Sequence, residues 1–296
     1  MLKKMKIAGF GKVAAATAIS GIILATTTPT APFALAQTGA DLAQLVSADE
    51  TVASLGTPAV MEAGHADMGL IFDGSQAEPL SLLVRDDSGE KPVWRYPADL
   101  VFAVGDAAIQ TLPDNSDYSF VGAKAGSQVW VIPQTQITDV PWLGWNTQSP
   151  SLLEAATRGV NMTFTGHQGP GEFAVFLQNG GFEKPEVLYS STNKGPQSAF
   201  VEMNAHTHAN WTFSEPGIHL VNIKMTTTSK EGTELSAEGI LRFAVGTGTD
   251  TSAARDTSWE GNDAAQKGKS SYVLWLGAAA VLVLALIAVG IRKKRS

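Results

Sequence analysis

The sequence predicts an all-β domain, specifically an antiparallel β-sandwich that is Ig-like in broad class. Short apolar segments recur through the middle of the chain, and Gly, Pro or Asn bounds each one. Residues 159–166, for example, alternate Val160, Met162 and Phe164 with polar neighbours, as a half-buried strand does. Helical periodicity is weak, with only modest candidates at 41–46 and 150–157. Many short strands between turns are typical of a sandwich.

The expected strands follow one another from the first third of the chain to residue 246. In order, they lie within "LSLLVRDDSG" (80–89), "SQVWVIPQ" (127–134), "GVNMTFTG" (159–166), "GEFAVFLQNGG" (171–181), "PGIHLVNIKMTTTSKEG" (216–232) and "SAEGILRFAVG" (236–246). We therefore assign the folded domain to residues 57–246, preceded by a short lead-in at 37–56. Residues 247–271 lack apolar periodicity and are rich in small and polar residues, which predicts a flexible stalk.

Both ends of the chain predict export. Residues 1–36 begin with lysines, continue with an apolar stretch and end in Ala-Leu-Ala, the order of a cleaved signal peptide. An uncut membrane-spanning helix is the alternative. Residues 272–291 form an uncharged segment that is long enough to cross the hydrocarbon core of a bilayer. The basic tail 292–296 would stay in the cytoplasm. The sequence thus predicts a single-pass cell-membrane protein with its folded domain outside the cytoplasm.

Composition narrows the function. The chain has no cysteine, which excludes disulfides, thiolate metal ligands and cysteine nucleophiles. Its formal net charge is −7, and the basic residues gather at the two ends, so nucleic acid is an unsuitable partner. Nucleophile-elbow, zinc-protease and phosphate-loop motifs are absent from the sequence. We expect a binding protein and no enzyme.

The histidines carry the chemistry. The chain has five, and His206 and His208 stand two residues apart in "HTHANW". In an extended strand these side chains share one face, about 6.5–7 Å apart, so both imidazoles can reach one ion. His65 in "GHAD" is the best third ligand, and Asp67 would add an oxygen ligand or orient a histidine. Three histidines and a carboxylate suit Zn²⁺, whereas Mn²⁺ or Fe²⁺ would favour more oxygen ligands. The alternative is an ordinary pair of exposed histidines.

Five stretches, taken together and in this order, resemble a known family. They are "GHADMGLIFDG" (64–74), "YSFVGAKAGSQVWVIPQTQ" (118–136), "PWLGWNT" (141–147), "GPGEFAVF" (169–176) and "HTHANWTFSEPGIHLVNI" (206–223). The chain is similar here to the actinobacterial surface-anchored domain, also called the choice-of-anchor M domain. That resemblance implies exported proteins with varied C-terminal anchors, often encoded beside metal-type ABC transporters, and hence an ABC-type metal importer as partner.

The family pattern places Gly-His-x-Asp and His-x-His-x-x-Trp on His65, Asp67, His206, His208 and Trp211 of this sequence. The same resemblance makes His219 structural, because the family usually has an aromatic residue at that position.

Other residues have weaker claims. We expect His167 in a loop, where it is a minor candidate for a further ligand. His219 shares a strand face with Val221 and Ile223, which is typical of a satisfied core histidine. Trp142, Trp145 and Trp211 could form an aromatic surface for a sugar or haem but more often close a core. Haem would need an axial His or Tyr, for which Tyr118 and Tyr189 are available. The acidic residues near Asp86 and Asp87 are expected to form a solvated turn and no Ca²⁺ loop.

The leading hypothesis is therefore a membrane-anchored cell-surface protein that captures a transition metal, Zn²⁺ first, for a partner ABC importer. Its metal ligands would be His65, Asp67, His206 and His208. The alternative is a structural or adhesive surface module, or a haem-binding protein, without a metal-ion site.

Overall fold

A computed structural model describes residues 45–180, 183–195 and 197–261 of the 296-residue chain. The expected signal peptide, transmembrane helix and basic tail lie outside these residues, as does part of the expected stalk. No helix within the described ranges is long and apolar enough to cross a membrane.

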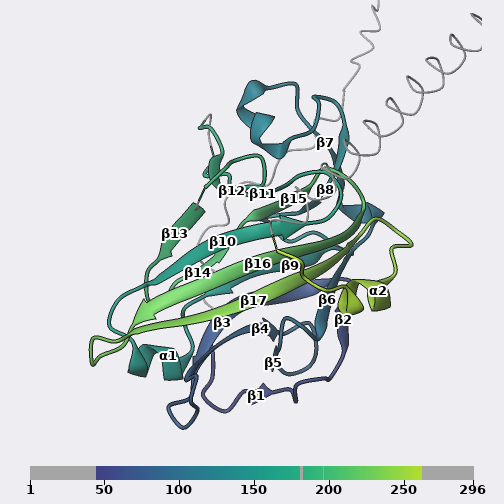
Figure 1. The fold of residues 1–296 in the computed structure, drawn as a ribbon. Helices are drawn as coiled ribbons and strands as arrows, with labels where there is room; N and C mark the ends of the chain where they lie inside the picture. Colours follow the sequence, from purple (N-terminus) through teal and green to yellow (C-terminus); the bar gives the residue numbers. More distant parts are fainter. Residues whose placement is uncertain (1–44, 181–182, 196, 262–296) are drawn as a thin grey trace, which may run out of the picture. The chain divides into compact units, whose positions relative to one another are not determined.

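The described residues form short helices and many strands (Figure 1). The strands are β1 (Thr51–Val52), β2 (Ala59–Met61), β3 (Gly64–Phe72), β4 (Leu80–Asp86), β5 (Val93–Arg95), β6 (Leu100–Val104), β7 (Ile109–Thr111), β8 (Gln128–Ile132), β9 (Pro141–Asn146), β10 (Val160–Gln168), β11 (Phe173–Leu177), β12 (Glu186–Ser190), β13 (Gln197–Val201), β14 (His206–His208), β15 (Asn210–Phe213), β16 (Gly217–Thr228) and β17 (Glu234–Val245). The helices are η1 (Asp106–Ala108), η2 (Ser116–Val121), α1 (Pro150–Ala155) and α2 (Thr251–Asp256).

The strands form three sheets. Their orders are β1-β5-β4-β3-β9-β14, β13-β10-β16-β17-β6-β2 and β12-β11-β15-β8-β7. The predicted all-β class is therefore confirmed at the level of a mainly β protein. The purely antiparallel pairing is wrong, because β1 and β5, β2 and β6, β6 and β17, and β3 and β9 run parallel. Two of these parallel pairs join the N-terminal strands β1 and β2 to strands that follow them in the chain.

The three sheets share one apolar core. Its centre contains the alternating residues Met162 and Phe164 of β10, as their sequence spacing predicts, together with Phe243 of β17 and Trp211 of β15. In the first sheet the core-facing residues include Met68 of β3. Because side chains alternate along a strand, the neighbours His65 and Asp67 on β3 point away from this core.

Several strands lead directly from one sheet into another. A single residue, Ala209, separates β14 of the first sheet from β15 of the third, and Ala209 is fully buried. This junction holds the segment His206–His208 firmly at the edge of the first sheet while Trp211 enters the core.

Residues beyond the expected domain boundaries are also structured. Upstream, Val46 packs with Leu83 and Trp94 on the outer face of the first sheet. Downstream, where we expected the start of the stalk, α2 packs its fully buried Ala254 against Val101 and Ala244. The Arg242 guanidinium donates to the carbonyls of Ala254 and Thr257 at 3.1 and 2.7 Å. Ordered structure thus continues past residue 246, where α2 packs on β6 and β17 and its end accepts hydrogen bonds from the half-buried Arg242.

Candidate metal centre

The centre is built on three neighbouring strands of the first sheet. The central strand, β9, pairs in parallel with β3 and antiparallel with β14. Gly144 of β9 stands opposite Asp67 on one side and His208 on the other. His65 and Asp67 are two residues apart on β3, as His206 and His208 are on β14, so all four side chains leave the same face of the sheet.

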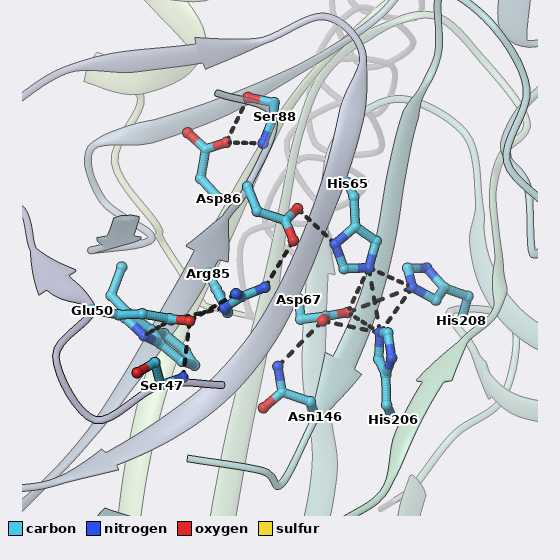
Figure 2. A network of polar contacts seen from close by, with 12 residues as sticks. Ser47, Glu50, His65, Asp67, Arg85, Asp86, Ser88, Asn146, His206 and His208 are labelled. Carbon is cyan, nitrogen blue, oxygen red and sulfur yellow. Dashed lines mark hydrogen bonds and ion pairs between the residues drawn. The ribbon is translucent and has the colours of Figure 1, made fainter. Parts of the chain in front are cut away.

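The four side chains meet at one point (Figure 2). The Nε2 atom of His65 lies 2.9 Å from that of His208 and 3.3 Å from that of His206. The Nε2 atoms of His206 and His208 are 3.1 Å apart. The Oδ1 atom of Asp67 lies 3.0 Å from His206 Nε2 and 3.6 Å from the Nε2 atoms of His65 and His208. The structure thus brings together the four residues that the leading hypothesis names as metal ligands.

A glycine makes room for this convergence. A Cβ atom on Gly144 would lie 2.7 Å from Asp67 Oδ1 and 2.9 Å from the His208 ring. It would also lie 2.5 Å from the Thr207 carbonyl oxygen. No side chain fits at these distances, so the floor of the centre must be bare backbone.

The centre is nearly closed to solvent. The exposed fractions of the side chains are 12% for His65, 2% for His206, 1% for His208 and 0% for Asp67. Trp142 covers it, with its ring stacked on His208 at a centroid distance of 3.9 Å and edge-on to His65 at 5.0 Å. The aromatic wall excludes water and leaves His65 as the most accessible of the four groups.

Outer residues hold two of the four groups in place. Asn146 donates from Nδ2 to Asp67 Oδ2 at 3.2 Å, and both oxygens of this carboxylate lie 3.0 Å from His206 Nε2. The His65 Nδ1 atom lies 2.7 Å from Asp87 Oδ1. Asp87 in turn accepts a hydrogen bond from Arg85 at 2.7 Å, and Arg85 also donates to Glu50 at 2.7 and 2.8 Å. Such outer contacts are typical of metal sites, where they fix the ring orientation and tautomer of the ligand.

The protonation states suit cation binding. Burial lowers the pKa of His208 to about 3; the Asp67 carboxylate opposes this change, and repulsion from His65 and His206 adds to it. Burial alone raises the pKa of Asp67, but the hydrogen bond from His206 and the attraction of the histidines outweigh it, so the pKa lies below its usual value. Near neutral pH the centre therefore presents a neutral His208 imidazole and a carboxylate, which are the forms that bind metal ions.

Protons alone cannot satisfy all the contacts. If the neutral His65 ring carries its proton on Nδ1 and donates it to Asp87, its Nε2 atom carries a lone pair and can only accept a hydrogen bond. His208 can then donate to His65, and His206 to Asp67. That leaves His206 and His208 as two donors facing each other across 3.1 Å. A cation among the four atoms removes this conflict because every nitrogen then offers a lone pair.

The spacing also fits a bound transition metal. Tetrahedral ligands with Zn–N bonds of about 2.0–2.1 Å lie about 3.3–3.4 Å from one another. The contacts among the four atoms, from 2.9 to 3.6 Å, bracket this separation. These residues could hold a metal ion in place with little movement.

The remaining histidines form a different arrangement. His167 lies on β10 and not in the expected loop, and its Nε2 atom is 2.9 Å from Nδ1 of His219 on β16. His219 Nε2 is 3.0 Å from the Glu215 carbonyl oxygen. His219 is thus a buried, hydrogen-bonded core residue, as expected. His167 is its hydrogen-bond partner and does not join the metal centre as a further ligand.

The aromatic residues do not form an exposed platform. Trp145 and Trp211 belong to the core, while Trp142 is 5% exposed against the histidines. Tyr189 is 4% exposed and packs in the same core, and Tyr118 donates to Gln178 at 3.1 Å. None of these five residues presents the open apolar slot that haem needs.

Sequence reasoning missed the support of the centre. Asn146, Gly144, Arg85 and Glu50 carry no motif that marks them as neighbours of the histidines. Asp87 was expected in a solvated turn, but its side chain is 14% exposed and contacts His65. The two carboxylates of "RDD" at the end of a predicted strand could have indicated Asp87 as a partner for a histidine, because metal-bound histidines commonly donate to a carboxylate.

Comparison with known proteins adds little. The chain matches no protein-family model and no curated protein. Among solved structures it is similar to the N-terminal domain of PorA, with 13% sequence identity and a TM-score of 0.22, over 51% of this chain and 89% of that one. The resemblance to the choice-of-anchor M domain therefore stays a prediction.

Proposed function

We propose that this protein binds one Zn²⁺ ion through His65, Asp67, His206 and His208. The observation that carries the proposal is the convergence of three imidazole Nε2 atoms and one carboxylate oxygen, all within 4.8 Å of one another, from two strands far apart in the sequence. Neutral imidazole and carboxylate are common zinc ligands.

Zinc suits this centre better than Mn²⁺ or Fe²⁺ for two reasons. Three of the four donors are nitrogen atoms, whereas Mn²⁺ favours oxygen. The side chains are also almost fully buried, so little room is left for the water molecules that would complete a six-coordinate shell. A four-coordinate protein site with no open position is typical of zinc held tightly and not used in catalysis.

Together with the sequence, this centre supports a role in metal capture outside the cytoplasm. The signal peptide at 1–36, the anchor at 272–291 and the basic tail predict an exported Ig-like domain on the cell membrane. The family resemblance adds an ABC-type importer as the partner. In this proposal the domain binds Zn²⁺ at the surface and passes it to the importer, and His65, the most exposed ligand, would leave the ion first.

Elemental analysis tests the proposal directly. The full chain, purified without a polyhistidine tag, should contain one zinc per molecule and should rebind one after chelation. Zinc affinity is then measured by competition with a chromophoric chelator. A full-length, folded protein that retains no zinc, manganese or iron near pH 7.5 would sink the proposal.

The closed site also favours a second function, in which the zinc only stabilises the domain. The two functions differ in the rate at which the zinc ion leaves the protein. A structural ion should leave over many hours and its removal should unfold the domain, whereas a captured ion should move to a competing chelator while the metal-free domain stays folded. Circular dichroism of the metal-free chain, recorded beside the transfer rate, separates the two functions.

A further inference from the structure

A chain of charged contacts runs from the metal centre to the first described residues of the protein. It starts at His65, whose Nδ1 atom lies 2.7 Å from Asp87 Oδ1. The other Asp87 oxygen accepts from Arg85 Nη1 at 2.7 Å. Arg85 donates two further hydrogen bonds to the Glu50 carboxylate, from Nη2 at 2.7 Å and from Nε at 2.8 Å (Figure 2).

Glu50 ties this chain to the segment before β1. Its carboxylate accepts from the Trp94 indole at 2.9 Å and from the Ser47 backbone N–H at 3.1 Å. The segment is anchored again beyond Glu50, where the Ala53 backbone N–H donates to the Trp94 carbonyl at 2.8 Å. The side chain of Glu50 is 7% exposed and that of Arg85 is 3% exposed, so these ion pairs lie mostly out of solvent.

The charges along the chain alternate in a way that favours the bound ion. Arg85 carries one positive charge between two carboxylates, so Asp87 keeps part of its negative charge for the His65 N–H. A carboxylate that accepts from the far nitrogen of a metal-bound imidazole makes that imidazole a better donor and fixes its orientation. This contact also selects the tautomer of His65 whose Nε2 lone pair points at His206 and His208.

We propose that Asp87 is a positioning residue for the zinc ligand His65, and that Arg85 and Glu50, by holding Asp87, make the segment Ser47–Glu50 part of the zinc site. This inference rests on the proposed zinc binding and deepens it: zinc affinity depends on a segment that supplies no ligand. By thermodynamic reciprocity, bound zinc must then stabilise the docked segment.

The neighbouring Asp86 supplies a matched control. Its side chain is 10% exposed, compared with 14% for Asp87, and each pairs with one arginine at 2.7 Å. Asp86 pairs with Arg95 and accepts from Ser88, so its side-chain partners lie outside the histidine cluster. Asp86 is the last residue of β4 and Asp87 follows it, so Asp86→Asn removes a similar ion pair at the neighbouring position without changing the proposed chain of contacts.

The first measurement is zinc affinity of the folded full-length variants by chelator competition. Asp87→Ala should weaken binding by about 10–100-fold, the usual effect of losing an outer partner of a metal-bound histidine. Glu50→Gln should weaken it by less, about threefold to tenfold, because Asp87 remains. Asp86→Asn should stay within about threefold of the wild type. Equal losses in Asp87→Ala and Asp86→Asn, or no loss in Asp87→Ala, would overturn the inference. If Asp87→Ala does not fold, Asp87→Leu takes its place, because leucine fills the space without an acceptor for the His65 N–H, and an unchanged affinity in that variant has the same meaning.

The second measurement follows the His65 ring itself. Long-range ¹H–¹⁵N NMR of the metal-free chain should show His65 protonated at Nδ1, with the signal assigned by its loss in His65→Gln. Asp87→Ala should shift His65 toward the other tautomer, while Asp86→Asn should not. This readout needs no zinc, so it separates failure of the positioning role from failure of the proposed function. A His65 tautomer that is the same in all variants contradicts the inference.

Hydrogen exchange tests the coupling to the segment. Zinc should slow exchange of the Ser47 and Ala53 amides in the wild type and in Asp86→Asn, and should slow it much less in Asp87→Ala. Equal slowing in all three proteins would show that the segment is independent of His65 and would overturn that part of the inference.

Discussion

Two groups of buried histidines, one on the first sheet and one on the second, behave in opposite ways. His167 and His219 form a complete hydrogen-bonded chain that ends on the Glu215 carbonyl oxygen, so each neutral ring finds its partner. His65, His206 and His208 instead turn the same ring nitrogen toward one point, beside the carboxylate of Asp67. The hydrogen bonds of the first arrangement pair its own rings, whereas the four side chains of the second could together hold a cation.

The difference shows what distinguishes a ligand from a core histidine. Burial lowers the pKa of His208 and of His167, each to about 3, so each group contains a buried, neutral imidazole. What differs is the acceptor. A peptide carbonyl takes the proton of His219, whereas the metal centre contains a carboxylate that needs a positive charge nearby. The carboxylate of Asp67, and not the number of histidines, distinguishes the candidate metal site.

The largest expected effect comes from removing a ligand. His206→Ala should lower zinc affinity by roughly a thousandfold or more, since four protein donors become three and a buried carboxylate loses its closest contact. His167→Phe should keep one zinc per molecule, although it leaves the His219 acceptor without a donor and costs about 1–3 kcal/mol of stability. Elemental analysis and chelator competition check both variants. Equal zinc loss in the two would break the comparison.

A second effect comes from the glycine beside each group. A Cβ on Gly144 would lie 2.7 Å from Asp67 Oδ1, and a Cβ on Gly169 would lie 2.7 Å from His219 Nδ1. Both Gly144→Ala and Gly169→Ala should lower stability by about 1–3 kcal/mol through overpacking. Only Gly144→Ala should also weaken zinc binding, by about tenfold or more, because it displaces a ligand. Denaturant melts and zinc titrations of the two variants side by side test this distinction.

The smallest expected effect is the pH response of the second group. Burial lowers the pKa of His219 to about 4, below the unfolded value of about 6.5. The unfolded chain then binds more protons between these values, so stability is complete above about pH 6.5 and falls as the pH drops toward 4. The loss should be about 1 kcal/mol per pH unit for this residue.

His219→Phe should reduce that pH response but not abolish it, because His167 and His208 also have pKa values lowered to about 3 by burial. Denaturant unfolding of the zinc-free chain at pH 7, 6 and 5 measures the slope. A slope unchanged in His219→Phe would show that other groups cause the acid response. The free energy of unfolding of the zinc-loaded protein should fall more steeply with decreasing pH, because protonation of the ligands also releases the ion.

Local pattern predicted much of the fold and the four candidate ligands. The alternation in β10 identified a strand with Met162 and Phe164 in the core, because side-chain direction depends only on the extended backbone. For the same reason, the spacing of His206 and His208 placed both rings on one face. Apolar periodicity does not state which strands pair, so it missed the parallel strands and the folded segment around α2.

Only the tertiary structure decided that these residues form one centre. His65 and His206 lie 141 residues apart, and they meet because β3 and β14 pair with opposite edges of β9. The same pairing makes Gly144 the floor, and the pairing of β1 with β5 and of β5 with β4 brings Glu50 to Arg85. Pairing between distant strands depends on how three sheets share one core, which is a property of the whole chain. The sequence by itself determined which side chains could bind an ion, and the packing of the sheets determined that they face one another.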